Sequence, residues 1–272
     1  MSLHVERLGA GPDLVLLHGW GLHGGAWQSL LPRLAASFRI HLVDLPGHGH
    51  SRDTPFGTLD EVVDAVAACT PAGAKVCGWS LGGLVALRLA TRHPERVAAI
   101  ALVSSTPCFT RRDDWPHGMA PETLEAFAGG LRAEPAKTIR SFVNLNALGG
   151  PHARDRMREL AALLAARGTP PSPALAAGLA LLHDTDLRDE VASIDRPAVV
   201  IHGGRDVLTP VGAGRWLAGR LPFARLVEIA EAAHLPFVSH PDTVAEALES
   251  LRDWGADGEE ARGRQMSPEE CR

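Results

Sequence analysis

A serine in the segment GWSLGG, residues 78–83, is the best-placed nucleophile of this chain. The segment has the pattern G-x-S-x-G, follows an apolar run at residues 75–78 and precedes a helical pattern at residues 81–93. At such a sharp turn between a strand and a helix, the serine hydroxyl is exposed at the edge of a sheet. The spacing predicts that Ser80 is a nucleophile. It also predicts that the backbone N–H of Leu81, the first helical residue, is free to stabilise an oxyanion.

A serine hydroxyl attacks at neutral pH only when a base removes its proton. The order along the chain expected for a G-x-S-x-G turn is serine, acid, histidine. Asp206 follows an apolar run at residues 198–201, and His234 follows another at residues 226–229. Because parallel strands end at one edge of a sheet, both side chains would lie near Ser80. We predict that His234 is the general base and that Asp206 orients it.

Other acids and histidines compete for these roles. Asp44 is the rival acid, but it precedes the serine and follows an earlier strand. His202 lies at a strand end, where a structural role is expected, and His240 would help to start the last helix. His48 and His50 form an isolated H-x-H without further ligands, which argues against a metal site. We expect neither a metal nor a cofactor.

The segment HGWG, residues 18–21, is the expected source of a second oxyanion donor. The backbone N–H of Trp20 is the natural candidate, paired with that of Leu81. The same residues would also serve as a plain strand-terminating turn. The glycines of residues 21–25 do not form a phosphate loop, because no Lys-Ser or Lys-Thr follows them.

Apolar runs alternate with helical patterns in two parts of the chain, which predicts βαβ units around a mostly parallel sheet with helices on both faces. The predicted strands cover residues 14–17, 39–44, 75–78, 97–103, 198–201 and 226–229. The predicted helices of these two parts cover residues 26–36, 58–69, 81–93, 211–220 and 241–254. We therefore expect an α/β fold whose core is made of residues 1–106 and 189–254.

Residues 107–188 interrupt this alternation. Amphipathic helical patterns replace the strands, near residues 121–133, 135–147, 152–167 and 173–183. An insert between two halves of an α/β sheet would lie over the carboxyl ends of the strands, where ligands bind. We interpret it as a helical lid, or cap. The charged residues 255–272 are expected to form a disordered tail.

The composition is that of an ordinary globular protein. The chain has 272 residues, a formal net charge of −5 and 45% hydrophobic residues. It contains no apolar stretch of about 20 residues, and we expect no secretory leader, because the first residues lack an apolar core and a cleavage site. The four cysteines show no metal-ligand spacing. We expect a cytoplasmic monomer that binds neither nucleic acid nor membrane.

Several motifs together resemble the α/β-hydrolase family over nearly the whole chain. They are LVLLHGWGL, LVDLPGHGHS, GWSLGGLVA, HPERV, GGRD and AAHLPFVSHP. More narrowly, HGWGL, HLVDLPG, GWSLGGLVA, SSTPCF, DDWP and AAHLPFVSHP resemble the carboxylesterases of biotin synthesis. This resemblance implies hydrolysis of the methyl ester of a pimeloyl chain on an acyl-carrier protein, through an acyl-enzyme on Ser80. It also implies that Trp20 and Leu81 frame the oxyanion and acyl site.

The same resemblance places substrate contacts in the insert. Residues 142–146 (Phe142, Val143, Asn144, Leu145 and Asn146) fall where the family has lid residues that touch the substrate, although the two asparagines depart from its pattern. Five basic residues lie nearby. Four of them, Lys137, Arg140, Arg154 and Arg158, are candidate contacts for an acidic carrier protein, and Arg156 is the fifth. A solvated helix face would show the same pattern.

Several alternatives share the predicted triad. They are a general short-chain carboxylesterase, a cofactor-free haloperoxidase-like hydrolase and a C–C bond hydrolase. Dehalogenases and epoxide hydrolases of this fold use an aspartate nucleophile, and position 80 is serine. A catalytically silent ligand-binding protein is the alternative from another class. An apolar slot for an acyl chain could come from Trp20, Trp79, Leu22 and Phe142, any of which could instead be core.

Overall fold

A seven-stranded sheet forms the centre of the computed structural model, which describes residues 2–147 and 153–252. The spatial order of the strands is β1–β3–β2–β4–β5–β6–β7. The strands are β1 (Val5–Leu8), β2 (Asp13–Leu17), β3 (Arg39–Val43), β4 (Ala74–Trp79), β5 (Val97–Val103), β6 (Ala198–Gly203) and β7 (Ala224–Ile229). All pairs are parallel except β1 with β3. The sequence prediction missed β1, a short edge strand whose central Glu6 and Arg7 are exposed.

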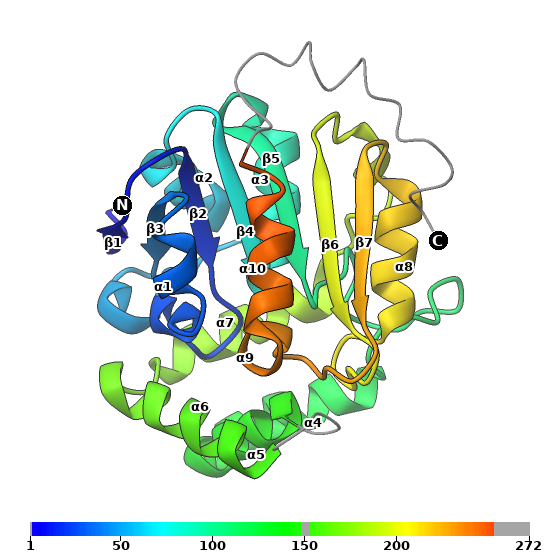
Figure 1. The fold of residues 1–272 in the computed structure, drawn as a ribbon. Coiled ribbons are helices and arrows are strands. Elements are labelled where there is room, and N and C mark those ends of the chain that lie inside the picture. Colours follow the sequence, from blue (N-terminus) through cyan, green and yellow to red (C-terminus); the bar gives the residue numbers. More distant parts are fainter. Residues whose placement is uncertain (1, 148–152, 253–272) are drawn as a thin grey trace.

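Helices cover both faces of the sheet, as the doubly wound pattern predicts. The core helices are α1 (Leu31–Leu34), α2 (Leu59–Cys69), α3 (Leu81–Arg92), α8 (Val211–Arg220), α9 (Pro236–Ser239) and α10 (Pro241–Glu249). Figure 1 shows α1 and α10 on the near face and α2 and α3 on the far face. The central strands β4 and β6 are buried along their whole length, because helices pack on both of their sides.

Two predicted helices are shorter than expected. The pattern at residues 26–36 becomes a 3₁₀ turn, η1 (Gly24–Trp27), and the single helical turn of α1. The His23 side chain accepts a hydrogen bond from the Gly25 N–H and so sets a tight turn at the start of this segment. The last helix, α10, ends at Glu249 rather than 254, where the Ser250 hydroxyl donates to the Ala247 carbonyl. The remaining 3₁₀ turns are η2 (Gly49–Ser51), η3 (Pro94–Arg96) and η4 (Val191–Ser193).

Four helices in the described part of the chain connect β5 to β6. They are α4 (Pro121–Ala133), α5 (Pro135–Ala147), α6 (Ala153–Arg167) and α7 (Ser172–Asp184), close to the four predicted ranges. Figure 1 shows them gathered across the end of the sheet toward which the parallel strands point. This is the edge at which α/β folds bind ligands. Among the described helices, none has the length and apolar character needed to cross a membrane. The predicted tail, residues 255–272, lies outside the described ranges.

Candidate active site

Ser80 lies at the sharp turn between β4 and α3. Its backbone has φ 54° and ψ −118°, a conformation that costs a non-glycine residue about 1–3 kcal/mol. The turn needs glycine on both sides, because a Cβ at Gly78 would collide with the backbone of Gly82. A Cβ at Gly82 would collide with the Leu17 carbonyl. The strained turn presents the Ser80 side chain at the carboxyl edge of the sheet.

His234 and Asp206 lie together on the loops that follow β7 and β6. The His234 Nδ1 is 2.8 Å from the Asp206 Oδ2, and both side chains are buried. The Asp206 Oδ1 accepts hydrogen bonds of 2.9 Å from the backbone N–H groups of Leu208 and Thr209. Burial alone would raise the pKa of Asp206, but the adjacent His234 and these hydrogen bonds lower it below its usual value. The carboxylate is therefore ionised and oriented toward the histidine.

Thr209 is a member of this cluster that the sequence prediction missed. Its hydroxyl donates to the Asp206 Oδ2 at 2.8 Å and lies 3.2 Å from the His234 Nδ1. The His202 Nε2 lies 2.8 Å from the Thr209 carbonyl, so this histidine has the structural role expected of it, directly behind the acid. Burial lowers the pKa of His202, which favours the neutral ring. The spacing Asp-x-x-Thr could have predicted this role of Thr209, because a hydroxyl three residues after an aspartate can donate to its carboxylate.

Asp44, the rival acid, faces a different set of groups. Its Oδ1 accepts from the Gly24 N–H at 2.7 Å and its Oδ2 from the His50 N–H at 2.8 Å. Arg167, the last residue of α6, lies 3.1 Å from the same carboxylate. Asp44 therefore links the first half of the core to the helical insert, whereas Asp206 contacts His234.

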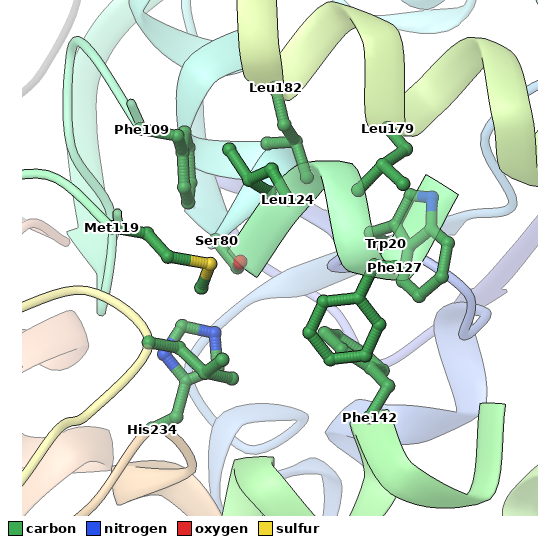
Figure 2. A pocket seen from close by; sticks show the side chains of 11 residues that line it. Trp20, Ser80, Phe109, Met119, Leu124, Phe127, Phe142, Leu179, Leu182 and His234 are labelled. Carbon is green, nitrogen blue, oxygen red and sulfur yellow. The ribbon is translucent and has the colours of Figure 1, made fainter. Parts of the chain in front are cut away.

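Ser80 and His234 share an apolar pocket beneath the insert. The described residues that line it are Trp20, Ser80, Phe109, Met119, Leu124, Phe127, Phe142, Leu179, Leu182, Leu208 and His234. Figure 2 shows Ser80 and His234 next to each other on one side, with Trp20 and Phe142 across the pocket. The only polar groups among these side chains are the Ser80 hydroxyl, the His234 ring and the Trp20 N–H, which donates to the Leu175 carbonyl at 2.9 Å.

Two of the four residues predicted to form the apolar slot line this pocket. The Trp20 and Phe142 rings pack edge to face, with centroids 4.7 Å apart. Leu22 and Trp79 are buried in the core instead. The Trp79 indole N–H donates to the His234 carbonyl at 2.9 Å and so helps to hold the loop that carries His234. Seven other described lining residues were not predicted: Phe109, Met119, Leu124, Phe127, Leu179, Leu182 and Leu208.

Phe142 is the one residue of the segment 142–146 among the described pocket-lining residues. Asn144 is exposed, Leu145 is half-buried, and the side chain of Val143 lies outside the described part of the structure. Asn146 is buried, and its side-chain amide donates to the Phe142 carbonyl at 2.8 Å. Asn144 therefore faces solvent, whereas Asn146 stabilises α5 through a hydrogen bond within the helix.

The predicted carrier contacts lie on the outer surface of the insert. Lys137 and Arg140 on α5 are exposed, as are Arg154 and Arg158 on α6. Lys137 lies 3.2 Å from Glu134, and Arg158 lies 3.4 Å from Asp155. Such exposed pairs are weak, so these cations remain available for another acidic surface.

The oxyanion candidates flank the nucleophile. Leu81 is the first residue of α3, and Trp20 follows β2. A Cβ at Gly19 would lie only 3.2 Å from the Ser80 Cβ, so the loop of residues 18–21 runs directly past the serine. The backbone N–H groups of Trp20 and Leu81 therefore remain the predicted oxyanion donors.

A serine at a strained strand–helix turn, with a histidine and a buried aspartate at the same sheet edge, defines the class of serine hydrolases. Residues 12–241 match the model of the alpha/beta hydrolase fold, and the chain belongs to this family. The predicted fold class and family resemblance are thereby confirmed.

Relatives and solved structures agree with this assignment. The chain is 46% identical to the pimeloyl-[acyl-carrier protein] methyl ester esterase of Nitrosomonas europaea over 253 residues, 92% of this chain and 99% of that protein. It is 46% identical to the protein of the same name from Chromobacterium violaceum over 91% of this chain and 97% of that protein. The enol-lactonase from Burkholderia xenovorans has a structure similar to it, with a TM-score of 0.81, 25% identity and coverage of 92% and 95% of the two chains.

Proposed function

We propose that this protein is a serine carboxylesterase that hydrolyses the methyl ester of pimeloyl-[acyl-carrier protein], giving the free pimeloyl carrier and methanol in biotin synthesis. The observation that carries this proposal is the apolar pocket with Ser80 and His234 side by side in its wall. The names of the two relatives, similar over more than nine-tenths of the chain, support the choice of substrate.

The proposed reaction is acyl transfer in two steps. His234 removes the Ser80 proton, and the serine oxygen attacks the ester carbonyl, while the N–H groups of Trp20 and Leu81 stabilise the oxyanion. Methanol leaves with the proton held by His234, and an acyl-enzyme remains on Ser80. Water, deprotonated by the same histidine, then attacks the acyl carbonyl. The ester bond to Ser80 breaks, the acid leaves, and His234 returns the proton to the serine oxygen. Asp206 fixes the histidine tautomer, because it accepts the Nδ1–H.

The pocket suits a neutral ester on an aliphatic chain. Its described walls carry no aspartate, glutamate, lysine or arginine side chain, and each methylene that they bury contributes about 0.8 kcal/mol. We infer that residues 107–188 act as a lid over a core of residues 1–106 and 189–254. The lid helices α4 and α7 provide Leu124, Phe127, Leu179 and Leu182. The partner would be a cytoplasmic acyl-carrier protein that delivers the chain.

The direct test is turnover of pimeloyl-carrier methyl ester beside a panel of p-nitrophenyl esters, followed by mass spectrometry of the carrier. Enzyme treated with a serine-directed phosphonate is the control. Fast loss of the methyl group, blocked by the phosphonate, is the expected result. Turnover of the small esters alone would favour a general short-chain esterase. Failure of the phosphonate to label the protein would favour a silent ligand-binding protein.

The basic face of α5 and α6 gives a separate prediction for the carrier. We expect the double variant Arg154→Glu/Arg158→Glu to lower kcat/KM for the carrier ester about tenfold at low salt, because charge reversal removes electrostatic steering. Turnover of p-nitrophenyl esters should not change, since both residues lie outside the described pocket lining. Arg220→Glu, an exposed reversal on α8, is the matched control. Wild-type carrier kinetics in the double variant would contradict the proposed docking face.

A further inference from the structure

Two buried histidines surround the turn that carries Trp20. We propose that His18 and His48 are positioning residues that aim the backbone N–H of Trp20 at the oxyanion. This inference rests on the proposed function, because it assumes that Trp20 is an oxyanion donor. It gives roles to a histidine of the HGWG turn and to one of the H-x-H pair, neither of which touches the described pocket.

His18 holds the peptide unit before Trp20. Its Nε2 accepts the backbone N–H of Leu45 at 2.9 Å, so the ring proton must be on Nδ1. The Nδ1 lies 2.8 Å from the Gly19 carbonyl and donates to it. That carbonyl shares a planar trans peptide unit with the Trp20 N–H, which therefore points in the opposite direction. The Leu22 N–H also reaches the Gly19 carbonyl, at a longer 3.4 Å.

His48 holds the peptide unit after Trp20. Its Nδ1 lies 2.8 Å from the Pro46 carbonyl and donates to it, which leaves Nε2 as an acceptor. The Nε2 accepts the backbone N–H of Gly21 at 3.2 Å. Gly21 has φ 74°, a conformation that only glycine adopts easily, so this peptide needs a partner to keep its orientation. Together, the two rings fix both peptide units that flank Trp20.

The surroundings keep both rings neutral. The two side chains are fully buried, with ring centroids 5.2 Å apart. Burial lowers the pKa of His18 to about 3 and that of His48 to about 4. Near neutral pH each ring therefore has one donor and one acceptor, which is the combination that its two hydrogen bonds use.

Paired variants distinguish loss of the hydrogen bonds that orient the Trp20 N–H from loss of the packing of the rings. His48→Leu removes the acceptor for Gly21, whereas His48→Gln keeps an oxygen close to the Nε2 position. His18→Leu removes the donor to Gly19, whereas His18→Asn keeps an N–H close to the Nδ1 position. The readouts are kcat and KM on a p-nitrophenyl ester. Inhibition by an alkyl trifluoromethyl ketone, which forms an oxyanion with the serine, is compared with inhibition by the matching methyl ketone.

We expect each leucine variant to lower kcat 10- to 100-fold with KM within about twofold, because one misaimed oxyanion donor is worth up to 10²–10³ in kcat. Affinity for the trifluoromethyl ketone should fall by the same factor, and affinity for the methyl ketone should not. His48→Gln and His18→Asn should recover most of both losses. His41→Leu, which removes a buried histidine bonded to Asp13, is the control and should keep its kcat.

Two results would overturn the inference: leucine variants with wild-type kcat, or an equal loss of affinity for both ketones. Wild-type enzyme that fails to hydrolyse any ester would instead refute the proposed function. Thermal unfolding checks that each variant is folded. If His18→Leu does not fold, the His48 pair decides the question, because His48 acts on the other peptide unit of the turn, through the Gly21 N–H.

Discussion

Ser80→Ala should lower kcat for every ester substrate by about 10⁵- to 10⁶-fold, with little change in KM. The serine oxygen forms the acyl bond, so its removal eliminates the covalent pathway, and only the weak catalysis by the oxyanion hole and binding remains. The backbone strain at φ 54° is the same for alanine, which also has a Cβ, so the fold should not suffer. Single-turnover kinetics and mass detection of an acyl-enzyme measure the effect.

Ser193→Ala is the matched control for this loss. Its hydroxyl is exposed and donates to the Glu190 carbonyl, and Ser193 is not among the described residues that line the pocket. It should keep wild-type kcat. More than about one-hundredth of wild-type turnover in purified Ser80→Ala would mean that another residue is the nucleophile.

The parts of the site that the sequence predicted are those fixed by local chain order. A glycine on each side of Ser80, between an apolar run and a helical pattern, specifies the strained turn without any knowledge of distant contacts. The loops that carry Asp206 and His234 follow from the same logic, because parallel strands place their carboxyl ends at one edge. The fully buried strands are predictable for a similar reason, since both of their faces are apolar.

The pocket walls could not be predicted in this way. Phe109 and Met119 precede α4, and no periodic pattern covers them. Leu124 lies on α4, but helical periodicity shows only which face of a helix is apolar and not what that face packs against. Thr209 was missed because its hydroxyl acts through a buried carboxylate three residues away. His48 could only be judged as a poor metal ligand, since a sequence does not show which backbone N–H a buried ring accepts.

Asp206→Asn should lower kcat about 10⁴-fold while the protein remains folded, and the cause is the histidine tautomer. In the wild type, one carboxylate oxygen accepts two backbone N–H groups and the other accepts the His234 Nδ1–H. The amide oxygen of asparagine must face the two backbone N–H groups, so its NH₂ group faces His234. The histidine then accepts at Nδ1 and has its proton on Nε2, where it cannot take the proton of Ser80. The pH dependence of kcat, together with the ring-proton resonances of His234, would show the changed tautomer.

Asp44→Asn is the control that decides between the two acids. Both oxygens of Asp44 accept backbone N–H groups, and Arg167 lies against the carboxylate. The NH₂ group of an asparagine there would face a backbone N–H or the guanidinium, which are also donors. We expect this variant to lose about 1–3 kcal/mol of unfolding free energy and to keep kcat within a few-fold. If Asp44→Asn instead lost 10⁴-fold in kcat and Asp206→Asn did not, the acid would be Asp44. The buried contact of His234 with Asp206, at 2.8 Å, argues for the first outcome.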